Sequence, residues 1–385
     1  MVHAHTKGLL VVMLSATSTL LPSCSDLPVP ADGGACAPVD GLFVASDASS
    51  NGFGAFARSG ATSMATGVDL GKDPAFASSK GRAFFVARDL DTIVEMVATC
   101  GTAKTKTSVA EPGRVGSTNP QDVAVANDGA LWVPRYNVPS VLVLGPGNAR
   151  KTIDLSGQDD DGNPNMASIH LATVGGVEKA FVALQRLDDR SGYASVKPSK
   201  IVRIDVARGE IDSETTLAGR NPFTLVVPWD GGLWFGTIGN VSSANEVDAG
   251  VERFDPGAGT SRLVVTEANL GGSVIAIALA EGCGVAIVAD ARTDVNATSV
   301  VTFDPRTGTV LRNTSNAVYG PTAGYDLWTA SWSGDTLFVG DRRRQDRGFP
   351  IHTFRRTESC TLTPETDAIF VAQKPVAIRT LPLAP

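Results

Sequence analysis

Charged side chains follow several short apolar runs along the chain, either directly or within a few residues. The residues concerned are Arg88, Asp89, Arg135, Tyr136, Arg186, Asp290, Arg292, Asp341 and Arg342. Arginine binds carboxylate or phosphate groups through two parallel hydrogen bonds. Two interpretations follow: a ring that binds an anionic or zwitterionic ligand, or a set of Arg–Asp bridges that only join neighbouring elements.

An Asp-rich turn supplies the best candidate metal ligands, Asp159, Asp161 and Asn163. Carboxylate and amide oxygens are ligands that Ca²⁺ prefers, which makes Ca²⁺ the one candidate cofactor; otherwise we expect none. The Glu that an EF-hand loop carries at its last position is replaced by His170. Asp, Asn and Gly also favour tight turns without any metal, so a simple turn is the alternative.

The N-terminal region is typical of a secretory signal over residues 1–23. Lys7 supplies positive charge, and Leu9–Leu14 form an apolar core that is too short to span a bilayer. The signal ends in Leu21-Pro22-Ser23-Cys24, which resembles the lipobox of bacterial lipoproteins. The resemblance implies that Cys24 is lipidated and that residues 24–38 form a tether. Because Ser25 follows the cysteine, it also implies that the protein is anchored in the outer membrane. An ordinary cleaved signal with a chance cysteine is the alternative.

The composition favours many short strands joined by turns. Of 385 residues, 43% are hydrophobic and 19% charged, with 40 Gly and 22 Pro. This mixture supports a sizeable core but few long helices. The net charge of −7 argues against a nucleic-acid partner, because such binders carry a basic excess.

One apolar pattern recurs at nearly regular spacing and organises the chain after the tether. Its third positions are residues 44, 86, 133, 182, 235, 288 and 339, with spacings of 42, 47, 49, 53, 53 and 51. An inner apolar run precedes most copies, and two further strands with turn signals follow. The copies are Leu42–Ala45, Phe84–Ala87, Leu131–Pro134, Ala180–Ala183, Leu233–Gly236, Ala286–Ala289 and Leu337–Gly340.

The repeats predict an all-β, seven-bladed β-propeller of four-stranded blades over residues 39–385. The first repeat lacks an apolar run before Leu42, and Lys374–Arg379 resembles that missing strand. We therefore expect the C-terminal strand to complete the first blade and close the ring, which removes exposed sheet edges.

The four cysteines after Cys24, an even number in an exported chain, favour disulfides over metal ligands. All four are placed in turns on one face of the ring. The pairing Cys36–Cys100 with Cys283–Cys360 joins only adjacent blades, and we prefer it among the three pairings that four cysteines allow.

The run from Asn119-Pro120 to Trp132-Val133 resembles the blades of streptogramin-lyase-like and YVTN-type bacterial propellers. As a family, streptogramin lyases use a histidine with acid–base groups and Mg²⁺ at the channel mouth, a place that His170 could take. Lactonase-type propellers hold a metal with acidic residues of inner strands, where Asp122 and Asp326 stand. The neighbours of these residues do not complete either catalytic set, so the resemblance implies a fold rather than an activity.

Two functions remain open at this stage. We expect a non-enzymatic ligand- or protein-binding scaffold whose partner is an envelope protein or glycan, and which meets the membrane only through the lipid anchor. The long loops Arg186–Ser199 and Ile238–Gly250 are the expected contact surface, because variable loops on rigid scaffolds carry recognition. The alternative is a metal-dependent lyase or lactonase in which Asp122, His170 and Asp326 converge on one ion.

Overall fold

The computed structural model describes residues 39–46, 51–64, 71–240, 247–290, 297–357 and 359–383. Cys24, Cys36, Arg292 and the segments 1–23 and 24–38 lie outside the described residues, so the expectations placed on them stay predictions. No helix among the described residues is long and apolar enough to cross a membrane.

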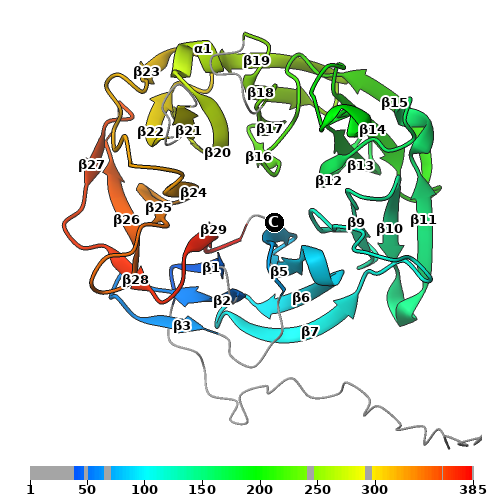
Figure 1. Ribbon diagram of the computed structural model, residues 1–385, viewed down its shortest axis with the longest axis horizontal. Coiled ribbons are helices and arrows are strands. Elements are labelled where there is room, and N and C mark those ends of the chain that lie inside the picture. Colours follow the sequence, from blue (N-terminus) through cyan, green and yellow to red (C-terminus); the bar gives the residue numbers. More distant parts are fainter. Residues whose placement is uncertain are drawn as a thin grey trace, which may run out of the picture.

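Seven antiparallel sheets stand around a central channel and form the predicted propeller (Figure 1). The first blades, from the channel outward, are blade 1 with β29 (Pro375–Thr380), β1 (Gly41–Ser46), β2 (Asn51–Phe56) and β3 (Thr62–Met64); blade 2 with β4 (Pro74–Ser79), β5 (Arg82–Ala87), β6 (Thr92–Val97) and β7 (Thr102–Ser108); and blade 3 with β8 (Ala124–Val125), β9 (Leu131–Val133), β10 (Ser140–Leu144) and β11 (Arg150–Asp154).

The remaining blades repeat this order, and blade 7 carries one additional strand. They are blade 4 with β12 (Met166–Val174), β13 (Val177–Leu184), β14 (Lys200–Asp205) and β15 (Glu210–Thr216); blade 5 with β16 (Val227–Trp229), β17 (Gly232–Thr237), β18 (Gly250–Asp255) and β19 (Thr260–Thr266); blade 6 with β20 (Ser273–Ala280), β21 (Cys283–Asp290), β22 (Ala297–Phe303) and β23 (Val310–Arg312); and blade 7 with β24 (Leu327–Ser333), β25 (Thr336–Asp341), β26 (Phe349–Arg356), β27 (Leu362–Pro364) and β28 (Ile369–Val371), which also pairs with β26.

Short helical turns occur only in connections between strands of the described chain. They are η1 (Arg88–Leu90), η2 (Pro146–Asn148), η3 (Ser156–Gln158), η4 (Asp189–Ser191) and α1 (Glu267–Leu270).

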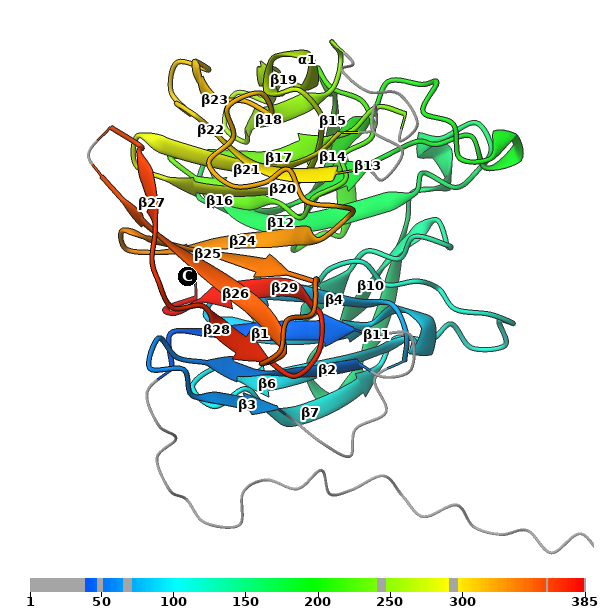
Figure 2. The ribbon, with the colours of Figure 1, turned by 60° about the vertical axis from the view of Figure 1, so that its left-hand side comes forward.

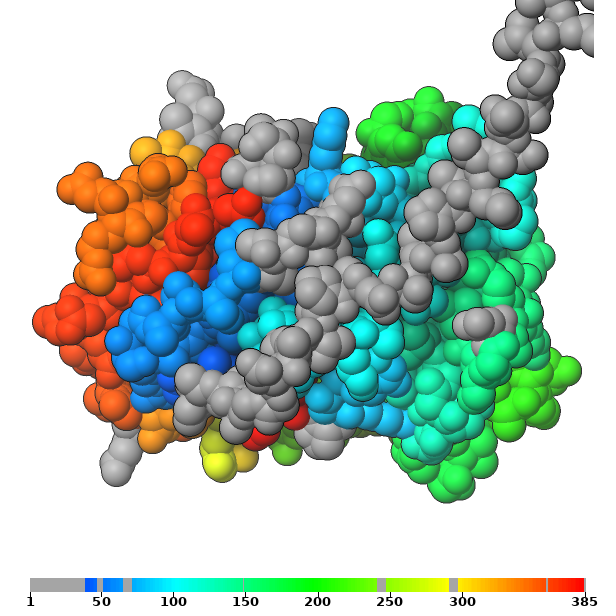
Figure 3. All heavy atoms as spheres, turned by 90° about the horizontal axis from the view of Figure 1, so that it is seen from below, coloured from blue at the N-terminus to red at the C-terminus, as the bar shows by residue number. Residues whose placement is uncertain are grey.

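The ring closes as predicted, because β29 pairs antiparallel with β1 (Figure 2). Phe43 stands opposite Ile378 in this ladder, and both side chains are buried. In the space-filling view, the red atoms of the C-terminal strands lie against the blue atoms of the first blade (Figure 3). Blade 1 therefore joins both ends of the described chain.

The core lies between neighbouring blades, where the two faces of adjacent sheets pack together. Phe53 of blade 1 contacts Phe85 of blade 2, with ring centroids 5.5 Å apart. On the other side of blade 1, Phe56 lies 5.4 Å from Phe338 of blade 7. Burial on both faces explains why the second strand of each repeat is almost continuously apolar rather than alternating.

Each inner strand has one edge without a strand partner, and that edge faces the channel. Polar side chains of the preceding blade accept hydrogen bonds from backbone N–H groups there. Ser79 accepts from Val125 at 3.0 Å, Asp122 from Ile169 at 3.1 Å, and Thr329 from Ile378 at 3.0 Å. These contacts satisfy buried donors and link successive blades around the channel.

Two inner strands are short, because β8 contains only two residues and β16 only three. In both places a side chain binds a backbone group at the strand start. The Asp122 carboxylate accepts from the N–H of Val123 at 2.8 Å, and the Thr224 hydroxyl accepts from Gly236 at 2.8 Å. Local side-chain bonding of this kind competes with the ladder.

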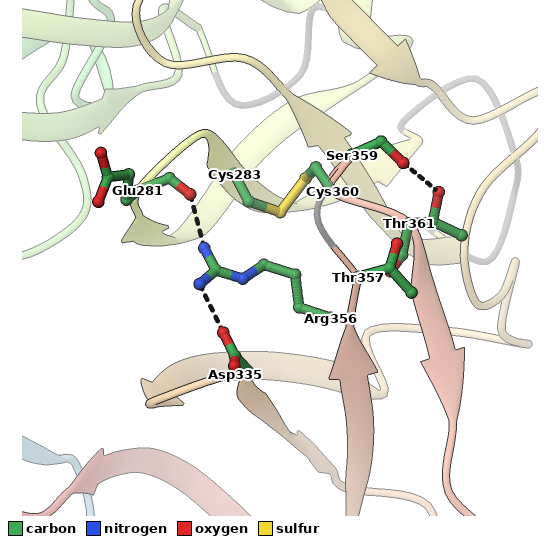
Figure 4. Close-up of a disulfide and its surroundings, with 8 residues drawn as sticks. All are labelled: Glu281, Cys283, Asp335, Arg356, Thr357, Ser359, Cys360 and Thr361. Carbon is green, nitrogen blue, oxygen red and sulfur yellow. Dashed lines mark hydrogen bonds and ion pairs between the residues drawn. A yellow bond between two sulfur atoms is a disulfide. The ribbon is translucent and has the colours of Figure 1, made fainter.

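The disulfide between Cys283 and Cys360 confirms one predicted pairing (Figure 4). It joins the start of β21 in blade 6 to the turn between β26 and β27 in blade 7, with 77 residues of sequence separation. Beside it, Arg356 donates to the Glu281 carbonyl and to Asp335, each at 2.6 Å. Cys100 is also disulfide-bonded, but Cys36 lies outside the described residues and the Cys36–Cys100 pairing stays a prediction.

Candidate functional site: the upper chamber of the channel

The channel widens into a cavity of about 600 Å³ at the end where the inner strands begin. We call this cavity the upper chamber. Arg379 lies at its inner end, because this side chain also lines the cavity at the opposite mouth. The other lining side chains include Lys72, Asp73, Phe76, Arg88, Gln121, Tyr136, Gln185, Phe223, Ile275, Trp328 and Arg342.

Positive charge dominates the upper chamber. Lys72, Arg88, Arg342 and Arg379 line it, while Asp73 is the one carboxylate among its described lining residues. Asp73 is exposed and only partly neutralises Arg88, whose Nη1 lies 3.4 Å away. The cavity is therefore cationic in a chain whose overall net charge is −7.

Two strand ends position Arg88 and Arg342. Arg88 begins η1 directly after β5, and Arg342 follows β25, so both leave the second strand of a blade beside the channel. The Arg342 guanidinium lies over the Trp328 indole, 4.9 Å from the ring centroid. Burial lowers the pKa of Arg342, and the charge of Asp326 opposes this effect. An arginine keeps its charge despite such a shift.

The arginines of the upper chamber retain hydrogen-bond donors that protein acceptors do not use. Nε of Arg88 and Nε of Arg342 are buried without a hydrogen-bond partner among the described residues. Arg379 donates from Nη1 to the Ile378 carbonyl at 2.9 Å and lies over the Phe76 ring at 5.7 Å. Burial lowers its pKa, whereas the Asp122 charge raises it. The guanidinium groups that line the chamber supply positive charge to any anion that enters it.

No family model matches the chain, and no curated protein is similar to it in sequence. Solved structures do resemble it. A streptogramin B lyase shares 14% identity over 80% of this chain and 86% of that chain, with a TM-score of 0.50. A Kuenenia stuttgartiensis hydrazine synthase shares 15% over 82% and 92%, with a TM-score of 0.53. The dihydro-heme d1 dehydrogenase NirN shares 11% over 91% and 77%, also with 0.53. The likeness shows the fold alone.

The structure places only part of the predicted charged ring at the upper chamber. Arg88, Tyr136 and Arg342 line it, whereas Arg135 and Asp341 are fully buried. This corrects the expectation of an accessible ring at those two positions.

Arg135 and Asp341, which lie in different blades, each stabilise the segment that follows a second strand. Arg135 forms an ion pair with Glu111, and its Nε donates to the Ser140 carbonyl at 3.3 Å. Asp341 lies 3.0 Å from Nε2 of His352 and accepts from the N–H of Arg343 at 2.8 Å. Both side chains thus support loops at the ends of second strands.

Three further members of the ring lie away from the upper chamber. Asp89 accepts from the Lys72 N–H at 2.9 Å, and Arg186 donates to the Pro198 carbonyl at 2.9 Å. Asp290 ends β21 but does not line the chamber. Asp89 and Arg186 thus bind backbone groups of loops, and none of the three residues lines the upper chamber.

The Asp-rich turn uses part of its oxygen atoms internally, whereas Asp159 Oδ2 and Asn163 Oδ1 are buried without a hydrogen-bond partner among the described residues. Asp159 forms ion pairs with Lys197 and Arg186, Asp161 accepts from the Asn163 N–H at 2.9 Å, and the Asn163 amide donates to Asp189 at 2.9 Å. Among the residues that the structure describes, no three His, Cys, Asp or Glu side chains gather closely enough to hold a metal ion. The Ca²⁺ site expected at Asp159, Asp161 and Asn163, which combines two carboxylates with an amide, stays a prediction.

Asp122, His170 and Asp326, the residues of the enzymatic alternative, do not lie together at one end of the channel. Asp122 and His170 line the opposite end of the channel, and Asp326 lines neither cavity. The Asp122 carboxylate binds the N–H groups of Val123 and Ile169, which gives it a structural role between blades 3 and 4. The convergence that this alternative requires is absent from the described part of the chain.

Sequence reasoning missed Arg379 and Trp328 as site residues. Arg379 was noted only as part of the closing strand, and Trp328 only within an inner apolar run. One signal could have identified Arg379: it is a charged residue in a predicted inner strand, and inner strands are otherwise largely apolar.

Proposed function

We propose that this protein is a non-enzymatic binding scaffold, held at the bacterial envelope through Cys24, whose upper chamber binds a small organic anion. The convergence of Arg88, Arg342 and Arg379 on one cavity carries the proposal. The three side chains line the cavity, and guanidinium groups form charge-assisted hydrogen bonds to carboxylate or phosphate groups.

The remaining wall of the upper chamber calls for an apolar part in the same ligand. Phe76, Phe223, Ile275 and Trp328 contribute apolar surface next to the arginines. Ligand cavities of a few hundred Å³ commonly combine such walls with a few polar groups that fix orientation. An aromatic or aliphatic acid or phosphate ester therefore fits better than a bare inorganic ion.

The loops above blades 4 and 5 supply a surface for an envelope protein or glycan partner. Tyr193, Val196 and Val247 are exposed there. The two loops contact each other, because the Ser195 N–H donates to Asn240 at 3.0 Å. Arg220 also bridges them, since it donates to the Ser195 carbonyl and pairs with Asp248. Exposed apolar residues on loops held by a rigid ring are typical of recognition surfaces.

Isothermal titration calorimetry with phenyl phosphate, and with phenol as its uncharged analogue, tests the anion site. We expect one phenyl phosphate per chain and an affinity that falls with added salt. Arg342→Gln should weaken binding about tenfold, since a hydrogen bond to a charged group contributes about 1.5–3 kcal/mol. Arg344→Gln is the matched control, because Arg344 is an exposed residue of the same loop that does not line the chamber.

Two outcomes count against the proposal. Equal affinity for phenol and phenyl phosphate would remove the role of charge. An equal loss in Arg342→Gln and Arg344→Gln would show that general surface charge, rather than the upper chamber, attracts the anion.

A further inference from the structure

The connection between β25 and β26 in blade 7 concentrates positive charge outside the upper chamber. Arg342, Arg343, Arg344 and Arg347 lie within six residues of a chain whose net charge is −7. We call the segment Arg342–Gly348 the blade 7 arginine loop. A guanidinium group keeps its charge and forms paired hydrogen bonds with carboxylates, so this loop is suited to an acidic partner.

The fold removes one of the two aspartates of this region from the surface. Asp341, which precedes the loop, is fully buried, and its carboxylate lies 3.5 Å from Nη2 of Arg343. Arg343, Arg344 and Arg347 are exposed, whereas Asp346 is the one exposed carboxylate within the loop. The loop therefore presents more positive charge to solvent than its sequence alone indicates.

Two of the exposed guanidinium groups lie over aromatic rings of the same blade. Arg344 lies 5.9 Å from the ring centroid of Phe349, and Arg347 lies 4.6 Å from that of Phe370. A ring face attracts the cation and restricts the motion of its side chain. Neither arginine forms an ion pair or a side-chain hydrogen bond with a described residue, so their N–H donors are open to solvent.

The tip of the loop is a tight turn that rests against β28. The Gln345 N–H donates to the Gly348 carbonyl at 2.8 Å, and the Gly348 N–H donates to the Gln345 carbonyl at 3.1 Å. Gly348 has a φ of 124°, and a Cβ there would lie 2.6 Å from the Val371 carbonyl oxygen. The additional strand β28 thus supports the turn and supplies the ring beneath Arg347. A loop held in this way loses little entropy on binding.

The shape and chemistry of this surface favour a thin acidic chain over a bilayer or a folded protein. Because the molecule as a whole is negatively charged, a planar anionic bilayer would repel the rest of it while contacting one loop. None of the exposed large hydrophobic side chains of the described residues lies in the loop, so it lacks the apolar anchors of a protein interface. A single polymer chain can contact the loop alone.

We infer that the blade 7 arginine loop binds an acidic polysaccharide through Arg344 and Arg347. Carboxylates along the polymer pair with the two stacked guanidinium groups. Arg343 contributes less, because Asp341 compensates part of its charge. The loop adjoins the upper chamber through Arg342, but polysaccharide binding does not require an anion in that chamber.

Surface plasmon resonance with immobilised polygalacturonate and the full-length chain tests this inference. We expect saturable binding that weakens as salt is added. The double variant Arg344→Gln/Arg347→Gln should weaken binding about fivefold, as expected for the loss of two exposed ion pairs. Arg262→Gln/Arg312→Gln is the matched control, because it removes the same charge from exposed positions in blades 5 and 6 and should leave the affinity unchanged.

The ring beneath Arg347 provides a second, independent readout. Phe370→Leu should weaken polygalacturonate binding about twofold, because it removes the surface on which the guanidinium rests. In an Arg347→Gln background the same exchange should cause no further loss, which a purely structural role of Phe370 would not produce. Equal losses in both backgrounds overturn the stacking argument.

Three results overturn the polysaccharide assignment. The first is an equal loss of affinity in the two double variants. The second is competition by polyglutamate as strong as that by free polygalacturonate, which would indicate an acidic peptide. The third is equally strong competition by phosphatidylglycerol vesicles, which would indicate a membrane surface. Phenyl phosphate affinity should stay unchanged in Arg344→Gln/Arg347→Gln, so failure of this loop is distinguishable from failure of the upper chamber.

Discussion

The guanidinium carbon of Arg342 lies 4.9 Å from the centroid of the Trp328 indole, and both side chains line the upper chamber. Trp328 belongs to β24 and Arg342 follows β25, so adjacent strands of one blade hold the pair together. The indole face stabilises the cation through the negative charge of its π-system.

We expect Trp328→Leu to weaken phenyl phosphate binding about threefold to fivefold, in line with a cation–π energy of about 0.5–1 kcal/mol. Trp328→Phe should retain most of the affinity because a ring face remains. Calorimetric titration of both variants checks this. Equal affinities for Trp328→Leu and the unmodified chain would show that the stacking does not position Arg342.

A second prediction concerns Asp122 and the pH dependence of stability. Burial raises the pKa of Asp122 to about 7, although the N–H groups of Ile169 and Val123 and the charges of Arg379 and Arg88 oppose the shift. The folded state therefore holds a proton that the unfolded state releases above its ordinary pKa of 3.8. The free energy of unfolding should fall as the pH rises from about 4 to about 7, and Asp122→Asn should remove this part of the slope.

Urea unfolding at pH 4.5, 6 and 8 measures the slope. His170→Gln gives the opposite comparison, because burial lowers the pKa of His170 to about 4. Its contribution to the free energy of unfolding rises with pH between about 4 and 6.5. Removing His170 should therefore steepen the decline that removing Asp122 flattens, and slopes that change in the same direction would contradict the assignment.

The Cys283–Cys360 disulfide should contribute strongly to stability. Closing a loop with a sequence separation of 77 residues restricts the unfolded chain, which corresponds to about 4 kcal/mol in the chain-entropy description. We expect the double variant Cys283→Ser/Cys360→Ser to have a lower denaturant midpoint by about that free energy. In this double variant, a reductant should lower the denaturant midpoint further only by breaking the disulfide of Cys100, which is disulfide-bonded as well.

Arg135 provides a test of the corrected site assignment. Its side chain is fully buried, with its guanidinium held by Glu111 and Ser140. Arg135→Gln should lower the free energy of unfolding by about 2 kcal/mol, since it breaks a largely buried charged contact. Phenyl phosphate affinity, measured below the onset of unfolding, should stay unchanged. Arg114→Gln in the nearby exposed loop is the control and should alter neither quantity.

Arg88 and Arg135 show how far sequence reasoning could reach within the site. Both follow the second strand of a repeat at the same relative position, after Ala87 and Pro134. Arg88 lines the upper chamber, whereas Arg135 turns into the protein towards Glu111. The acceptors that decide between these directions lie in separate connecting segments, and a repeat pattern contains no information about them.

The amino-acid sequence left three pairings of the four cysteines open, but it was sufficient to predict the seven blades and the closing strand. Each follows from local apolar runs, turn residues and regular spacing, which act over a few residues and repeat along the chain. The binding surfaces were decided only by the tertiary structure. Arg88, Arg342 and Arg379 come from blades 2, 7 and 1, and they face one cavity only because seven inner strands stand around a common axis.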